Sequence, residues 1–138
     1  LSESKDKTLA ALGAKSLKEV KYHLHHSTNW LIRLGDGTEE SNSKAQESLD
    51  NIWQFTAELF EMDEIDTELL NSGIAVDNKA LKLEWDKIVN NTLKKAKLKR
   101  PEDDYMATGG KKGMHTEYLG FLLAEMQFLQ RAYPDAKW

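Results

Sequence analysis

The side chains best suited to chemistry are an acid, a phenol and two imidazoles that lie close together in the first quarter of the chain. Glu19, His23 and His26 are spaced four and three residues apart, so on a helix they lie on one side. A Glu-x-x-His pair on a bundle helix is half of a common two-metal site, because carboxylate and neutral imidazole both bind iron. Here Tyr22 stands where that pair needs its imidazole, and a neutral phenol is a poor ligand. The four positions therefore indicate a degenerate metal site.

Two interpretations of these side chains stay open. Glu19, His23 and His26 could bind a metal ion together with ligands from other helices. Alternatively, Glu19 pairs with a lysine of a facing helix, and the histidines make ordinary polar contacts at the edge of a bundle. We favour the second, because Tyr22 interrupts the ligand pattern and Lys18 precedes Glu19 where di-iron oxygenases often carry an acid. We therefore predict no metal site and no catalytic residue in this chain.

No other catalytic constellation is visible in the sequence. The chain has no cysteine and no Gly-x-Ser-x-Gly motif, so it lacks the usual signatures of a nucleophile. The string Gly-Gly-Lys-Lys-Gly at residues 109–113 lacks the spacing and the following Ser or Thr of a phosphate-binding P-loop. Hydrolase and nucleotidase functions are not supported.

A basic segment stands out from an acidic chain. The formal net charge of the chain is -4, yet the segment from Lys94 to Lys112 contains seven Lys and Arg residues and only three acidic residues. The overall acidity argues against non-specific nucleic-acid binding. Backbone N–H groups and ammonium charges in such a loop can bind phosphates or an acidic partner, whereas the alternative is a solvated basic loop. The predicted patch consists of Lys97, Lys99, Arg100, Lys111 and Lys112.

Length and composition predict one all-α domain over residues 1–138. With 40% hydrophobic residues the chain can build a core without disulfides. No apolar run approaches the roughly 20 residues of a membrane span, and the first residues are too charged for a signal peptide. We expect a soluble protein without membrane contact. The absence of cysteine fits a reducing compartment, so the cytoplasm is the expected location.

Four long helical patterns and one short pattern account for most of the chain. The first begins near Ser2 or Ser4 and ends at residue 34, and the break at residues 35–37 is short enough to make the second helix antiparallel to it. The remaining elements are a second helix from Thr38 to about residue 62, a short helix at residues 63–70, a third long helix from Asp77 to about residue 96, a polar and mobile connection at residues 97–114, and an aromatic last helix.

Apolar residues spaced three and four apart predict which faces of these helices are buried. The last helix is apolar on more than one face and should be buried as well. The predicted inward residues are Leu17, Val20, Leu24, Ser27, Leu31 and Leu34 on the first helix, Ala45, Leu49, Ile52, Trp53, Thr56, Leu59 and Phe60 on the second, and Leu81, Trp85, Ile88, Val89 and Leu93 on the third.

Three strings resemble one known protein family. They are Lys-Glu-Val-Lys-Tyr-His at residues 18–23, Arg-Leu-Gly-Asp-Gly-Thr-Glu-Glu-Ser at residues 33–41, and the aromatic segment at residues 115–138. They resemble the C subunits of bacterial phenylacetyl-CoA monooxygenase, the ring 1,2-epoxidase of aerobic phenylacetate degradation. The resemblance implies a ferritin-like antiparallel helical bundle, of which this chain looks like the C-terminal portion, without the first helices of the full subunit.

The resemblance also implies a function. In this family the C subunit is a structural, non-catalytic partner, while a homologous A subunit holds the di-iron centre and epoxidises the ring of phenylacetyl-CoA. No cofactor is then expected in this chain, and di-iron is expected in the partner. The basic patch becomes a candidate contact for the CoA phosphates, and Trp138 a candidate partner contact. As a portion of a bundle, the chain is also expected to form a homo-oligomer.

Two other functions remain alternatives. One is a di-metal carboxylate oxidase or metal-binding bundle, which needs Glu19 with His23 or His26 as ligands. The other is a stand-alone helical adaptor. A measurement of metal content distinguishes the metal-binding bundle from the oxygenase subunit. Dependence of phenylacetyl-CoA turnover on this chain distinguishes the oxygenase subunit from the stand-alone adaptor.

Overall fold

The computed structural model describes residues 1–137, and Trp138, a predicted partner contact, lies outside the described residues. No strand occurs among residues 1–137, which confirms the all-α prediction; the ferritin-like topology stays a prediction. The predicted four long helices and one short helix are present. They are α1 (Lys7–Gly35), α2 (Glu39–Trp53), α3 (Glu64–Asn71), α4 (Asn78–Lys95) and α5 (Tyr118–Ala132), with short 3-10 turns η1 (Ala57–Phe60) and η2 (Gly110–Lys112).

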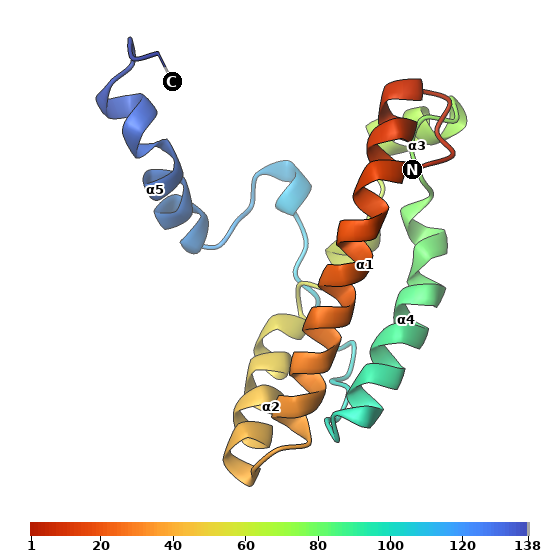
Figure 1. Ribbon diagram of the computed structural model, residues 1–138, viewed down its shortest axis with the longest axis vertical. Coiled ribbons are helices and arrows are strands. Elements are labelled where there is room, and N and C mark those ends of the chain that lie inside the picture. The colour runs from red at the N-terminus through yellow and green to blue at the C-terminus, as the bar shows by residue number, and fades with distance from the viewer. Residues whose placement is uncertain (138) are drawn as a thin grey trace. The chain divides into compact units, whose positions relative to one another are not determined.

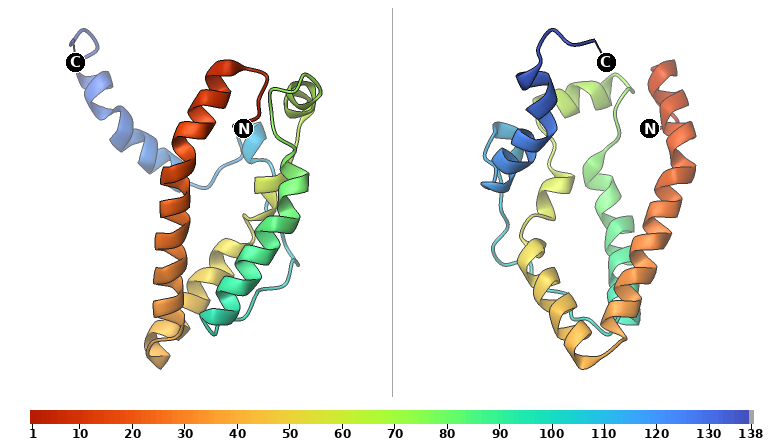
Figure 2. Two further views of the ribbon diagram at one scale, coloured as in Figure 1. Left: turned by 45° about the vertical axis from the view of Figure 1, so that its right-hand side comes forward. Right: turned by 60° about the vertical axis from the view of Figure 1, so that its left-hand side comes forward.

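The chain forms two compact units, and the single domain stays a prediction. The first unit is Leu1–Ala107, and the second begins at Thr108. Within the first unit, α1 packs against both α2 and α4, and α4 also contacts η1. Figures 1 and 2 show α2 returning antiparallel to α1 after the short connection, as predicted, and α4 running alongside α1.

Local capping chemistry sets most helix starts. Thr38 caps α2 and Asp77 caps α4, at the residues where these two helices were expected to begin, and each accepts a hydrogen bond from a backbone N–H of the first turn. Asp63 starts α3 through a reciprocal capping box. The predicted start of α1 was wrong, because Asp6 caps it by accepting from the N–H groups of two first-turn residues. Ser4 is used elsewhere: its hydroxyl donates to the carbonyl of Ile74 at 2.7 Å.

The second helix is shorter than predicted. We expected it to reach about residue 62, but α2 ends at Trp53. The hydroxyl of Thr56 donates to the Trp53 carbonyl at 2.8 Å, and the Ala107 N–H donates to the Gln54 carbonyl at 2.8 Å. Carbonyls that would continue the helix are therefore bound by other donors. The redirected chain places the Phe60 ring edge-on against Trp85, with centroids 5.3 Å apart.

The buried core is small and lies where α1, α2 and α4 meet. Its buried members are Leu49, Trp53, Leu93, Ala96 and Leu98, with Leu31, Ile32, Ala45, Trp85, Val89 and Met106 packed around them. The predicted seam of α1 is mostly uncovered, because only Leu31 of that set packs against the core. The predicted inward residues that stay at least 36% exposed are Leu17, Val20, Leu24, Ser27, Leu34, Ile52, Leu59, Leu81 and Ile88.

Three helix ends converge at a glycine. Gly35, the last residue of α1, is buried, and a Cβ added there would overlap the carbonyl oxygen of Ala96 and lie 2.9 Å from its Cβ. Asn42 of α2 donates from Nδ2 to the carbonyls of Gly35 at 2.5 Å and Lys97 at 3.3 Å. Lys97 turns the chain with a φ of 55°, and the Leu98 N–H closes α4 on the carbonyl of Leu93. Only glycine allows α1 this close to α4.

The segment predicted to be mobile is held in place over its first part. Leu98 is buried in the core. Gln46 pairs with the Lys99 backbone in both directions, donating to its carbonyl at 2.9 Å and accepting from its N–H at 2.8 Å. We call residues 97–107 the strap, because they run from the end of α4 back to the end of α2.

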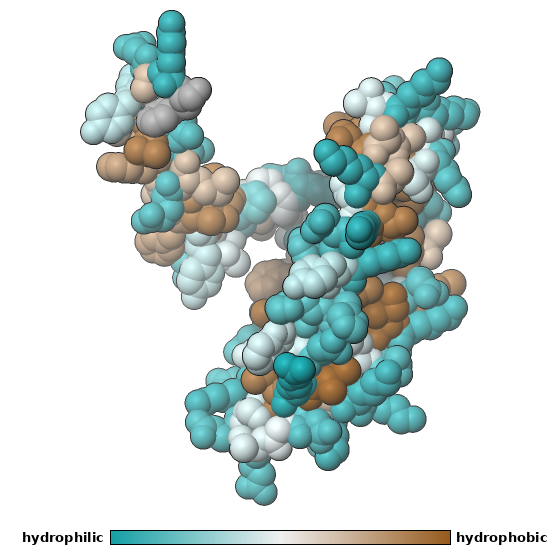
Figure 3. All heavy atoms as spheres, viewed as in Figure 1, coloured by the Kyte–Doolittle hydropathy of each residue, from teal (hydrophilic) through white to brown (hydrophobic). Residues whose placement is uncertain are grey.

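The second unit exposes most of its apolar side chains. Gly109 and Gly113 adopt positive φ angles around η2. On α5 the side chains of Tyr118, Phe121, Met126 and Phe128 are each at least 64% exposed, so the expected burial of this helix is not achieved within the described chain. Figure 3 shows hydrophobic side chains gathered over α5. Across residues 1–137, none of the helices combines the length and apolar character needed to cross a membrane.

Gly35→Ala should lower the free energy of unfolding by about 1–3 kcal/mol, because the new methyl group meets backbone that cannot rotate away. The control is Gly120→Ala in α5, where an added Cβ has no neighbour within 4 Å and should favour the helix slightly. Urea unfolding followed by circular dichroism measures both. Equal stability of Gly35→Ala and the unmodified chain would contradict the close approach.

Candidate functional site

The predicted metal-site positions form an exposed row of rings on α1. The Tyr22 ring stacks on His26 at 6.0 Å and lies edge-on to His23 at 6.0 Å. His26 in turn meets the Trp30 ring edge-on at 6.3 Å. Glu19 forms no ion pair within residues 1–137, so the lysine partner considered for it is not seen. These are contacts between neighbouring turns of one helix.

This row does not fit a di-iron centre. Such a centre needs carboxylates and imidazoles from several helices that converge on two ions. In the part of the chain that the structure describes, no three His, Cys, Asp or Glu side chains gather closely enough to hold a metal ion. Tyr22 also occupies the position where the motif requires an imidazole.

The five predicted patch residues lie in different surroundings and have different partners. Lys97 pairs with Asp36 at 2.5 Å at the end of α1, and Lys99 uses its backbone to hold Gln46. Both border an open groove on α2 whose other lining side chains include Glu47 and Asp50. Two lysines and two carboxylates line the groove, so it has no clear preference for an anion.

The other three patch residues belong to two different units of the chain. Arg100 lies inside the first unit, where it belongs to a polar network. Lys111 and Lys112 lie in η2 of the second unit, in a loop bounded by Gly109 and Gly113. The five predicted patch residues are therefore divided between the first and the second unit.

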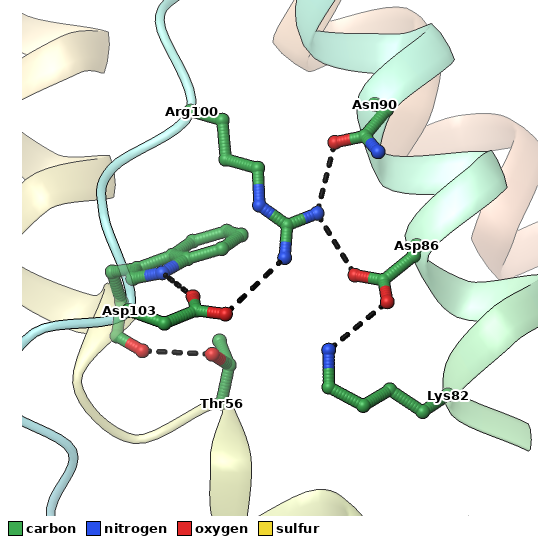
Figure 4. A network of polar contacts seen from close by, with 7 residues as sticks. Thr56, Lys82, Asp86, Asn90, Arg100 and Asp103 are labelled. Carbon is green, nitrogen blue, oxygen red and sulfur yellow. Dashed lines mark hydrogen bonds and ion pairs between the residues drawn. The ribbon is translucent and has the colours of Figure 1, made fainter.

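Arg100 is the centre of the most connected polar group in the first unit (Figure 4). Its Nη1 lies 2.8 Å from Asp86 Oδ1 and donates to Asn90 Oδ1 at 2.9 Å, both on α4. Its Nη2 lies 3.7 Å from Asp103 of the strap. The planar guanidinium suits this arrangement because it offers several donors in fixed directions, which a lysine cannot do.

Two indoles complete the environment of Arg100. Its guanidinium carbon lies 4.8 Å from the Trp53 ring centroid and 5.9 Å from that of Trp85, both within the range of cation–π attraction. The Trp53 Nε1–H donates to Asp103 Oδ1 at 2.9 Å. The network therefore joins α2, α4 and the strap. We call Trp53, Trp85, Asp86, Arg100 and Asp103 the Arg100 clamp.

Neighbouring cations shift the pKa of the Asp86 carboxyl. The Lys82 ammonium, 3.0 Å from Asp86 Oδ2, and then the Arg100 guanidinium hold the pKa of the Asp86 carboxyl below its usual range, while partial burial opposes this shift. A lowered folded-state pKa means that the carboxylate stabilises the fold above the ordinary Asp pKa of about 4. That stabilisation is lost as the pH falls through the lower, folded-state value.

Sequence reasoning assigned Arg100 to an external patch and missed its partners. Two weak signals were available in the sequence. Arg100 is the one arginine among the lysines at residues 94–100, and Asp103 follows three residues later. Neither signal points to Trp53 or Asp86, because pairing depends on how the strap crosses α2 and α4.

Arg100→Ala should lower the free energy of unfolding by about 2–4 kcal/mol, because it leaves Asp86 and Asp103 without their shared cation and removes the indole contacts. Lys99→Ala is the matched control, since the exposed Lys99 side chain forms no ion pair within residues 1–137; it should change stability by less than about 0.5 kcal/mol. Urea titration followed by tryptophan fluorescence compares them. Similar effects of the two variants would contradict a clamp.

Asp86→Asn should remove part of the acid sensitivity of the fold. We expect it to cost about 1–2 kcal/mol at pH 7. This cost should shrink as the pH falls below about 4, because the Asp86 carboxylate is protonated first in the unfolded chain and then, at its lower pKa, in the folded chain. Unfolding free energies of both chains between pH 7 and pH 3 measure the difference. Asp104→Asn, at an exposed position next to the clamp, should show no such convergence.

Comparison with known proteins places this site in a family. The family model described as "Phenylacetic acid catabolic protein" matches residues 1–138. Among known proteins, the C subunit of the 1,2-phenylacetyl-CoA epoxidase of Escherichia coli (strain K12) is 50% identical over 138 residues, which is 100% of this chain and 56% of that relative. The chain thus spans little more than half the length of the relative. A match over every residue at this identity shows that the chain belongs to the phenylacetic acid catabolic protein family.

Proposed function

We propose that this chain acts as a structural, non-catalytic subunit of a multicomponent phenylacetyl-CoA ring 1,2-epoxidase, in which it pairs with a di-iron catalytic subunit. The observation that carries the proposal is the 50% identity, over the whole chain, to the C subunit of a 1,2-phenylacetyl-CoA epoxidase. The cysteine-free sequence is compatible with the reducing cytoplasm, where we place this assembly.

The side chains of α1 support a non-catalytic role. Tyr22 replaces the imidazole of the two-metal motif, and its ring contacts His23 and His26. A centre that activates oxygen would need a converging set of ligands, and the described part of the chain offers none. In this proposal the di-iron centre of the assembly belongs to the catalytic partner.

The exposed apolar surface supports a role in assembly. A chain whose long helices leave many large apolar side chains in water gains stability when partners cover them. Both α1 and α5 carry such side chains, and either surface can serve pairing with other subunits.

The chain should form a stable complex with the di-iron catalytic subunit of its own epoxidase, seen by size-exclusion chromatography with light scattering. The full-length E. coli relative, mixed with its own catalytic partner, is the positive control. A folded, helical chain that stays unbound under conditions where the control assembles would contradict the pairing. The run on the chain alone also measures its oligomeric state, which we expect to exceed a monomer.

We also propose that the glycine-lysine loop at residues 109–113 contacts the phosphates of the acyl-CoA. Its support is the pair of adjacent ammonium groups of Lys111 and Lys112 between glycines with positive φ. In the assembled oxygenase, Lys111→Ala with Lys112→Ala should raise the KM for phenylacetyl-CoA several-fold with little change in kcat, because a phosphate contact binds ground state and transition state alike. Lys94→Ala with Lys95→Ala is the control. Unchanged kinetics at moderate salt would remove this assignment.

A further inference from the structure

The short connection between α1 and α2 contains a residue pair that can modify itself. Asp36 is the one aspartate of the chain that a glycine follows directly. The backbone nitrogen after an aspartate can attack the carbon of the side-chain carboxyl group. Glycine hinders this attack least, because it has no side chain and its backbone rotates freely. The surroundings of Asp36 and Gly37 then decide how fast the attack occurs.

The reaction needs no partner other than water. The Gly37 nitrogen forms a bond to Asp36 Cγ while the C–OH bond of the protonated carboxyl group breaks, and the amide proton leaves with the hydroxyl group as one water molecule. The product is a cyclic succinimide. Water then opens the ring at one of its two carbonyls. Opening at Cγ restores aspartate, whereas opening at the main-chain carbonyl gives isoaspartate, in which the backbone runs through the side-chain carbons.

The fold places a glycine after Asp36 and leaves its nitrogen without a partner. Within residues 1–137 the Gly37 N–H donates to no backbone carbonyl, whereas the Asp36 N–H donates to the Ile32 carbonyl at 2.8 Å. A Cβ at position 37 would lie 2.7 Å from Ser41 Oγ and 2.9 Å from the Arg33 carbonyl oxygen. A larger residue is therefore disfavoured at the position where glycine makes the reaction easiest.

The folded conformation keeps the two reacting atoms apart. Asp36 has a ψ of 17°, which places the Gly37 nitrogen beside the Asp36 nitrogen, whereas ring closure needs it beside Cβ. Lys97 also holds the Asp36 carboxylate, with Nζ 2.5 Å from Oδ1. Ring closure therefore requires rotation about the Asp36 Cα–C bond and loss of this ion pair, which together amount to a local opening of the connection.

The neighbouring contacts show what the modification would disturb. Gly35 packs against the backbone of Ala96, and its carbonyl accepts a hydrogen bond from Asn42 of α2 at 2.5 Å. Isoaspartate at position 36 adds one carbon atom to the backbone between Gly35 and the Thr38 cap. The longer connection moves the start of α2 away from the end of α1, so the bond from Asn42 is weakened.

We propose that Asp36 is a site of spontaneous isomerisation to isoaspartate, and that the ion pair with Lys97 slows the reaction in the folded chain. The modification is a non-enzymatic change of the backbone at the point where three helix ends meet. The inference rests on contacts within the first unit, and it does not depend on the proposed activity.

The test incubates the whole chain in mildly acidic buffer at physiological temperature and follows the formation of isoaspartate over time. Trypsin cleaves after Arg33 and Lys44, and Asp36 is the only aspartate of the resulting peptide 34–44. Chromatography separates the two forms of this peptide, and electron-transfer fragmentation locates the altered bond. Deamidation of Asn42 in the same peptide changes its mass and is therefore counted separately.

Four variants separate the reaction from its control by the fold. Lys97→Gln removes the charge that holds Asp36, and Lys97→Arg keeps it. Lys99→Ala is the control for charge, because the Lys99 side chain forms no ion pair within residues 1–137. Asp36→Glu keeps a carboxylate, but its longer side chain must close a larger ring, which is slower. Circular dichroism confirms that each variant is folded.

We expect isoaspartate to form faster in peptide 34–44 than in any other peptide of the folded chain. Its rate should rise about two- to fivefold in Lys97→Gln and stay unchanged in Lys97→Arg and Lys99→Ala. Asp36→Glu should abolish it in this peptide. Absence of isoaspartate at position 36 in the folded chain would overturn the site, even where the urea-unfolded chain is converted. Equal rates in Lys97→Gln and the unmodified chain would overturn the control by Lys97.

Discussion

The first unit depends on how closely three helix ends approach one another. Gly35 lets the end of α1 touch the backbone of Ala96, and one amide, that of Asn42, binds a carbonyl from α1 and one from Lys97. Carbonyls at helix ends lack partners within their own helix, so this amide satisfies groups that would otherwise need water. The contact fixes the separation of α1 and α4, and the small core forms directly beside it. Further from this end, α1 keeps its apolar seam exposed.

Polar interactions provide part of the stability that a larger hydrophobic core would otherwise provide. Only a handful of side chains are buried, yet the Arg100 clamp joins α2, α4 and the strap through two carboxylates and two indoles. Because the indoles partly exclude water, these interactions are stronger than exposed ion pairs such as that of Lys44 with Glu40. The clamp also explains why a charged strap stays close to the protein.

The sequence predicted features governed by neighbouring residues and missed those governed by distant ones. Thr38 and Asp77 were identifiable as caps because a cap binds N–H groups within its own first turn. The early end of α2 depends on an N–H from Ala107, and Trp53 finds Asp103 across 50 residues, so no local pattern could reveal either contact. The resemblance of three strings identified the family, whereas helical periodicity marked Leu17, Val20 and Leu24 as a seam without showing what lies against them.

The turn after α4 shows how packing can override backbone preference. Lys97 occupies a left-handed conformation that costs an ordinary residue about 1 kcal/mol or more, and its exposed ion pair with Asp36 returns little of that. What holds the turn is Leu98, buried with Leu93 in the contact that accompanies this type of helix end. The buried side chain of Leu98, rather than the side chain of Lys97, thus sets the direction in which the chain leaves α4. A polar residue at position 98 would remove this burial, and the strap would no longer bring Arg100 to the Trp53 and Trp85 indoles.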